Sequence, residues 1–160
     1  MELLAVHYTS AVPGLALRTW RRMEEFCERY ESESDINMLF DEFMNSYFSD
    51  SPYMIPFVIV DNGEIIAHAV VTMENYYGNK YINIFQHWKN RGCTIPSDLY
   101  TEFFSTIKKW GELHGTDRVR LWARNESVAR LFRRGLGFER DEKVIMNSSL
   151  SLLEKRMTDR

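Results

Sequence analysis

A β-hairpin signature constrains the fold of this chain more than any other feature of its sequence. In PFVIVDNGEIIAHAVVTM (residues 56–73), Asn62 and Gly63 separate two runs of apolar residues. An Asn-Gly pair readily adopts the positive φ angles of a two-residue turn, and the flanking β-branched residues favour extended strands. The sequence therefore predicts two antiparallel strands and a domain built around a β-sheet.

Strand and helix patterns alternate on both sides of this hairpin. Gly115 is expected to end the helix that begins near Ile95, and Asn125 is expected to cap the helix that follows. The predicted elements are a strand at 3–8, helices at 11–30 and 35–48, the hairpin, a strand at 80–88, a helix at 95–114, a strand at 118–123, a helix at 125–134 and a strand at 142–146. Their order, β-α-α-β-β-β-α-β-α-β, predicts an α/β (α+β) fold with a mixed central sheet and helices on both faces.

Length and composition narrow the class of protein. The chain has 160 residues, 44% of them apolar, which suits one domain over residues 1–146 and a C-terminal tail or short helix over 147–160. The net charge of −3 argues against nucleic-acid binding, and no apolar run is long enough to span a membrane. Cys27 and Cys93 make no disulfide framework, so a reducing compartment such as the cytoplasm is expected.

Charge is distributed unevenly along the chain. Acidic residues dominate residues 24–50, where Arg29 is the single base, and arginines dominate residues 118–140. Such runs form either two solvated helix faces of opposite sign or a site for an anionic ligand or an acidic protein. The cluster of Arg130, Arg133 and Arg134 allows both interpretations.

The segment RVRLWARNESVARLFRRGLGFERDEKVIM (residues 118–146) resembles the GNAT acyltransferase superfamily. Asn125, Ala129, Phe132, Gly137 and Phe138 fall in the register of the family's pattern of Asn, Ala, an aromatic residue and a Gly-Phe turn. The stretch NRGCTIPSDL (90–99) is similar to the family's RG-x-G-x-G-x-x-L loop. The resemblance covers residues 3–146 and implies a GNAT-like fold and a site for acetyl-coenzyme A.

The loop that resembles the family's pyrophosphate site has three unfavourable substitutions. Thr94 and Pro96 stand where the family pattern has glycines, and Asp98 places a carboxylate in the first turn of the next helix. An ordinary helix start, with Thr94 as a cap and Pro96 in the first turn, explains all three residues. If coenzyme A binds at all, the resemblance assigns its contacts to Arg91, Gly92, Cys93, Thr94, Ile95, Ser97 and Asn125.

The residues for acetyl transfer are also incomplete. The family's proton-donating tyrosine corresponds to Phe132, which cannot donate a proton. His87 is the best candidate for a general base, ahead of His68 and Glu74. Cys93, near a helix N-terminus, leaves a covalent acyl intermediate as another route. No cluster of residues has the spacing of a metal site.

Two functions follow from this resemblance. One is a GNAT-like protein that has lost acetyl transfer and acts by binding; degenerate chains of this kind resemble acetyltransferase-like proteins encoded among the virion and assembly genes of tailed bacteriophages. It implies protein partners, bound through the C-terminal tail or the charged helix faces, and a virion-associated location. The alternative is an active acetyl-coenzyme A-dependent N-acetyltransferase acting on a primary amine. A small-molecule sensor that keeps the pocket without the chemistry is a third option.

Overall fold

The computed structural model describes residues 1–5, 18, 20, 21, 41, 53–90, 92–123, 126–140 and 151–157. These residues belong to two compact units. The first comprises Met1–Val71 and Gln86–Leu99, and the second comprises Thr72–Phe85 and Tyr100–Arg160. The predicted strand at 142–146 and most of the two predicted N-terminal helices lie outside the described residues. Within those two helices the structure describes Arg18, Trp20, Arg21 and Asp41, and all four are helical.

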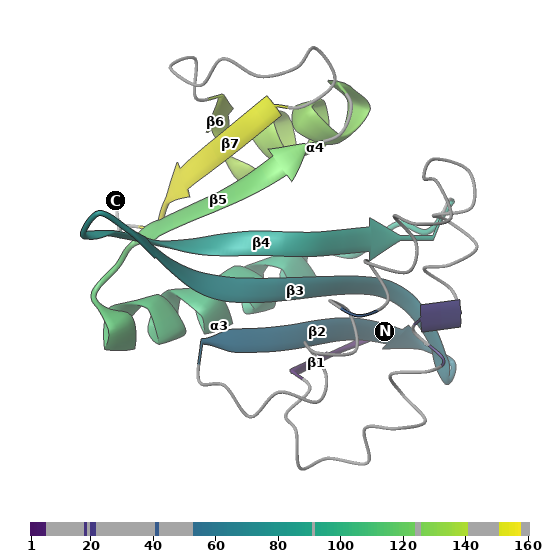
Figure 1. Cartoon of the computed structure of the whole chain (residues 1–160). Coiled ribbons are helices and arrows are strands. Elements are labelled where there is room, and N and C mark those ends of the chain that lie inside the picture. Colours follow the sequence, from purple (N-terminus) through teal and green to yellow (C-terminus); the bar gives the residue numbers. More distant parts are fainter. Residues whose placement is uncertain are drawn as a thin grey trace. The chain divides into compact units, whose positions relative to one another are not determined.

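The described residues form the mixed α/β architecture that the sequence predicts. The elements are β1 (Glu2–Ala5), β2 (Met54–Asp61), β3 (Glu64–Tyr76), β4 (Asn79–Lys89), α3 (Ser97–His114), β5 (Arg118–Ala123), α4 (Glu126–Leu136), β6 (Glu139–Arg140) and β7 (Ser151–Arg156). The strands follow the order β1-β2-β3-β4-β5-β7-β6 (Figure 1). β4 and β5 run parallel, whereas β1 with β2, β5 with β7 and β6 with β7 are antiparallel.

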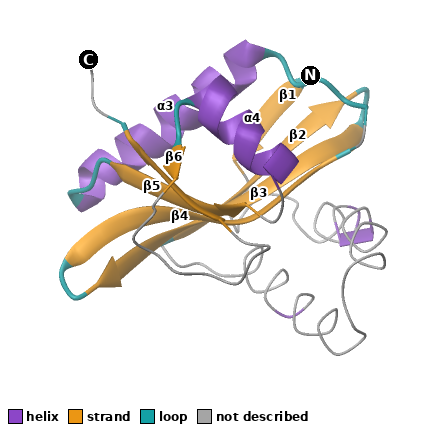
Figure 2. Ribbon diagram, turned by 90° about the horizontal axis from the view of Figure 1, so that it is seen from above, coloured by secondary structure: helices purple, strands orange, loops and turns teal. Residues whose placement is uncertain are grey.

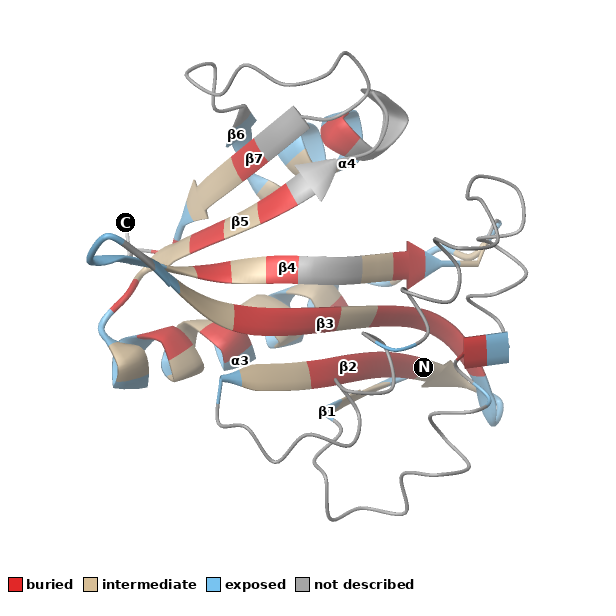
Figure 3. Ribbon diagram, viewed as in Figure 1, coloured by how far each residue is buried: buried red, intermediate tan, exposed pale blue. Residues whose placement is uncertain are grey.

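The first unit contains the predicted hairpin. Asn62 and Gly63 have φ angles of 50° and 78°, so they form the turn between β2 and β3 as expected. β1 adds an antiparallel strand at the outer edge of β2. Val58, Val70 and Val71 are fully buried, and Figure 3 shows the buried central stretches of β2 and β3. Because β2 and β3 are buried along continuous apolar runs, apolar and polar residues do not simply alternate along them.

The second unit shows the alternation expected of a strand with one buried face. Val119 and Leu121 of β5 are fully buried, whereas Arg118 and Arg120 point to the opposite face and remain partly exposed. α3 and α4 lie on the same side of β5 (Figure 2). Ile107 of α3 is also fully buried. The core of this unit therefore forms on the helical side of β5, and its arginines occupy the other side.

Within the range 147–160, where the sequence analysis expected a tail or a short helix, Ser151–Arg156 form a strand. β7 lies between β5 and β6, with Leu153 opposite Leu121. Leu153 is fully buried, and the amide of Met157 donates a hydrogen bond of 2.7 Å to the carbonyl of Asp117. The helix prediction was wrong here because only a partner strand, distant in sequence, reveals that this short apolar run completes a sheet.

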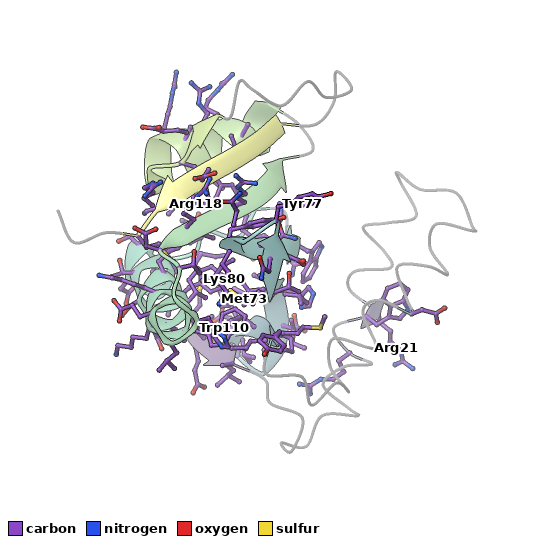
Figure 4. All side chains as sticks on the ribbon, turned by 60° about the vertical axis from the view of Figure 1, so that its left-hand side comes forward. Arg21, Met73, Tyr77, Lys80, Trp110 and Arg118 are labelled. Atoms are coloured by element: carbon purple, nitrogen blue, oxygen red, sulfur yellow. The ribbon has the colours of Figure 1, made fainter. Side chains whose placement is uncertain are left out.

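The hairpin between β3 and β4 turns at Tyr77 and Gly78, within the aromatic-rich stretch ENYYGNKY (residues 74–81). Their φ angles are 49° and 81°, and Tyr77 is 89% exposed, projecting outward in Figure 4. The hairpin is fixed to the end of α3, because Lys80 Nζ donates to the carbonyl of His114 over 3.3 Å. Thr116 Oγ1 also donates to the carbonyl of Lys80 over 2.8 Å.

An ion network joins β5 to β7 on the polar face of the second unit. Nε of Arg118 and Nε of Arg120 each lie 2.8 Å from a carboxylate oxygen of Glu154. Burial alone would raise the pKa of Glu154, but hydrogen bonds and charge from the two arginines outweigh it and hold the pKa below its ordinary value. The network therefore stabilises the fold only while Glu154 is ionised.

We expect Glu154→Gln to lower the free energy of unfolding by about 1 kcal/mol at neutral pH. Because the folded-state pKa of Glu154 is depressed, its contribution is fully present above the ordinary pKa of 4.5 and is lost as pH falls through the folded value. Urea denaturation at a series of pH values measures the difference between the two proteins. A difference that stays constant as the pH falls through this window would contradict the expected titration.

Candidate functional site

The junction between β4 and α3 is the candidate cofactor loop. β4 ends at Lys89, and the next amide, that of Asn90, donates to the carbonyl of Ile66 over 2.9 Å. The amide of Cys93 then donates to the carbonyl of Asn90 over 3.3 Å, and Gly92 between them has a φ angle of 77°. These contacts make a tight turn that only a glycine enters without strain. The loop therefore leaves the strand in a fixed direction.

After this turn, alternate side chains of the loop point inward and outward. Cys93 and Ile95 are partly buried, and Thr94 and Pro96 are exposed. The inward side chains pack on a hydrophobic cluster of the first unit, formed by Ile59, Ile66, Ala67 and Leu99. The positions where the family pattern has glycines therefore carry side chains on the outer surface of the loop, the surface that a ligand would approach.

The start of α3 differs from the capping arrangement that the sequence suggested. The helix begins at Ser97, one residue after Pro96, and the amide of Leu99 donates to the carbonyl of Pro96 over 3.1 Å. Thr94 is exposed, and its hydroxyl has no hydrogen bond with any described residue. The prediction that Thr94 caps the helix and Pro96 occupies its first turn was therefore wrong. The Pro96 carbonyl takes the role that the Thr94 hydroxyl was expected to fill.

Three positions at the start of α3 and in the loop before it offer an anion no free backbone donor. Pro96 has no amide, and the amides of Cys93 and Leu99 are already bonded within the loop. Asp98 is exposed in the first turn of α3, where its charge opposes that of a phosphate. Lys89 Nζ donates to the carbonyl of Cys93 over 2.8 Å. A ligand phosphate would have to compete for that ammonium group.

The other predicted site residues are placed as follows. His87 is half-buried near the end of β4, in the first unit. Phe132 lies on α4 in the second unit, where its ring meets that of Phe138 edge to face at 5.4 Å. Arg91 and Asn125 lie outside the described residues. The structure thus brings Gly92, Cys93, Thr94, Ile95 and Ser97 together in one loop and gives Phe132 a packing contact.

Two features of the described surface were not singled out from the sequence. Lys89 supports the loop through a backbone carbonyl, and its position just after an apolar strand gave no sign of this. Glu154 joins two arginines of β5, which requires knowing that the tail is a strand. In the described part of the chain no group of three or more His, Cys, Asp or Glu residues is placed to hold a metal ion, and no helix there has the length and apolar character of a membrane span.

Comparison with known proteins rests on structure alone. No protein-family model matches the sequence, and no curated protein is similar to it. The PaiA N-acetyltransferase of Thermoplasma acidophilum, solved in complex with coenzyme A, superposes with a TM-score of 0.61 at 14% identity, over 98% of this chain and 99% of that one. The aminoglycoside 6'-N-acetyltransferase of Enterococcus faecium gives 0.65 at 12% identity, over 100% and 99% of the two chains.

A protein of Desulfovibrio desulfuricans assigned to the GNAT family of acetyltransferases gives a TM-score of 0.68 at 9% identity, over 98% of this chain and 99% of that one. This chain has the GNAT acetyltransferase fold. The likeness extends over nearly the whole of each compared chain, so the GNAT fold predicted from the sequence is confirmed. At such identities the likeness concerns the fold and not the chemistry.

The parallel pair of strands in this GNAT fold is short. β4 and β5 pair from Ile82 opposite Val119 to Ile84 opposite Leu121. All of these paired residues belong to the second unit.

Proposed function

We propose that this GNAT-fold protein acts by binding a partner and does not transfer acetyl groups. The observation that carries the proposal is the outer surface of the loop between β4 and α3. Thr94 and Pro96 fill that surface with side chains, and Asp98 adds a negative charge at the helix start. A diphosphate needs the opposite features, which are bare backbone, converging amides and a positive helix end.

Phe132 supports the same conclusion from the second unit. Acetyl transfer releases a thiolate, which must take a proton. Phe132 occupies the position that the resemblance gives to a tyrosine, and its ring packs against Phe138. A phenylalanine in an aromatic cluster stabilises α4 against the strand that follows, but it has no proton to donate. Two parts of the predicted chemistry, cofactor capture and thiolate protonation, are therefore weakened independently.

The partner that we propose is a protein. The resemblance to acetyltransferase-like proteins of tailed bacteriophages suggests a component of a virion or its assembly, met in the reducing cytoplasm of a host cell. The exposed face of α4 carries Arg130, Arg133 and Arg134, together with the 44% exposed Leu131. An acidic surface with an apolar contact fits that face. The tail offers less surface, since Ser151–Arg156 belongs to the sheet.

A second candidate function is supported by the fold, which this chain shares with the PaiA N-acetyltransferase of Thermoplasma acidophilum, solved in complex with coenzyme A. In the second candidate, this chain also binds the cofactor. In that case the protein would be an acetyl-coenzyme A-dependent N-acetyltransferase. His87 would be its candidate base, and Arg91, Gly92 and Asn125 would help to hold the cofactor.

Calorimetric titration with acetyl-coenzyme A distinguishes the two candidates. We expect no binding heat at millimolar cofactor, because exposed side chains cover the outer surface of the loop and Asp98 places a negative charge at the helix start. The Thermoplasma acidophilum PaiA N-acetyltransferase, solved with coenzyme A, is the positive control in the same buffer. Tagged chain isolated from its own source should also retain a protein partner through washing. Micromolar cofactor affinity that disappears in Arg91→Ala, or acetylation of an amine by the purified chain, would replace our proposal with the second candidate.

A further inference from the structure

The polar side of the second unit carries an organised group of side chains. Residues two apart on a strand share a face, so the register of β4, β5 and β7 places one set of residues side by side. Asn83 lies opposite Arg120, and Arg120 lies opposite Glu154. The set, which we call the arginine face, consists of Tyr81, Asn83, Arg118, Arg120, Glu154 and Arg156.

Arg120 is held on this face by a carboxylate and an aromatic ring. Its Nε lies 2.8 Å from Glu154 Oε2, and its guanidinium carbon lies 4.6 Å from the centre of the Tyr81 ring. The side chain is 23% exposed, so it is held between two strands while one part remains open to solvent. An arginine fixed by a carboxylate and an aromatic ring loses little rotational freedom when it binds a further group.

The contacts of Arg120 leave most of its donors unused. A guanidinium has five N–H donors, and Glu154 accepts only the one on Nε. Among the residues that the structure describes, no acceptor bonds to either terminal amino group of Arg120. Arg118 binds the same carboxylate, because its Nε and Nη2 donate to the two oxygens over 2.8 and 3.1 Å.

The charge of the arginine face is consequently positive at Arg120. Glu154 is shared by two cations, so it neutralises neither fully. Arg156 is paired with Asp117 at 3.9 Å on the exposed margin of the face. A planar fork of N–H groups with surplus positive charge matches an oxyanion, either a carboxylate or a phosphate.

We propose that Arg120 anchors a binding site for the oxyanion of a small ligand that lies on the arginine face, with Tyr81 and Asn83 beside it. The site goes beyond the proposed function and is independent of the cofactor loop, since all its residues belong to the second unit. Glu154 and Tyr81 act as positioning residues that hold the guanidinium.

An NMR titration of the full chain tests this site with two probes, citrate for carboxylates and inorganic pyrophosphate for phosphates. We expect the arginine Nε–H signal of Arg120 to shift in a saturable manner with one of the probes. Arg120→Lys keeps the charge but loses the fork and should weaken binding roughly tenfold or more. The matched control is Arg21→Lys, an exposed arginine of the first unit, which should leave the affinity unchanged.

The outcomes separate binding from a purely structural role. Saturation by citrate assigns the site to carboxylates, and saturation by pyrophosphate assigns it to phosphates. Tyr81→Leu removes the ring that contacts the guanidinium and should weaken binding of the probe that saturates the site. Thermal denaturation of this variant and of wild type shows whether the substitution also changes stability. Absence of saturation with both probes in the folded wild type would overturn the proposal. So would affinities that respond equally to Arg120→Lys and Arg21→Lys.

Discussion

Replacing Gly111 by alanine is expected to destabilise the protein by about 1–3 kcal/mol, the usual cost of overpacking a core. A Cβ at this position of α3 would lie 2.7 Å from the carbonyl oxygen of Thr116 and 3.0 Å from Cδ1 of Ile82. Helix propensity alone predicts the opposite sign, because alanine is favoured over glycine within a helix by up to about 1 kcal/mol. The steric cost decides the outcome, since the nearest atom belongs to the backbone.

The backbone of Thr116 has little freedom to move away from such a Cβ. Its amide donates to the carbonyl of Gly111 over 2.9 Å, and its hydroxyl donates to the carbonyl of Lys80 over 2.8 Å. Gly111 is itself buried, against Ile82 of β4 and Met157 after β7. Relief of the clash would therefore require the end of α3 to separate from the turn that follows it.

Gly135→Ala is the matched control for Gly111→Ala. Gly135 also lies in a helix, α4, but it is exposed, and a Cβ there would meet only Leu131 Cδ1, at 3.8 Å. We expect this variant to be more stable than wild type by about 0.5–1 kcal/mol. Urea denaturation of both variants measures the two changes. If both substitutions changed the free energy of unfolding by the same amount and in the same direction, close packing would not be what determines the effect of Gly111→Ala.

Much of the fold was predictable because local signals agreed with the final structure. The Asn62-Gly63 turn and the end of α3 before Gly115 follow from backbone conformations that few residue types favour. The helices at Ser97–His114 and Glu126–Leu136 lie within two residues of the predicted ranges. Local chemistry determines turns and caps, and these elements need no knowledge of distant parts of the chain.

The features that were missed depend on distant contacts. Nothing in residues 151–156 indicates that they pair with β5, because a short apolar run suits a helix or a strand equally. Without that pairing Glu154 has no visible partner, and the Arg118–Glu154–Arg120 network remains hidden. The sequence predicted where the cofactor loop lies in the chain but not which of its side chains face outward. That depends on the packing of Cys93 and Ile95 on the core.

Restoring the loop should create affinity for acetyl-coenzyme A. In the triple variant Thr94→Gly, Pro96→Gly and Asp98→Asn, the outer surface becomes bare, an amide returns at position 96, and the opposing charge is removed. One charge-assisted hydrogen bond contributes about 1.5–3 kcal/mol, and removal of the acid at the helix start contributes about 0.3–1 kcal/mol. Their sum corresponds to roughly a hundredfold gain in affinity, measured by calorimetric titration.

The control variant carries the same charge change one turn later in the helix. Glu102 is exposed on α3, and Glu102→Gln should leave cofactor binding unchanged, because the influence of a charge on a helix end fades within the first turn. Thermal denaturation must show the triple variant folded, since two added glycines cost stability. A folded triple variant with no gain in affinity would mean that the loop is not what limits cofactor binding. An equal gain in Glu102→Gln would instead attribute the effect to overall charge.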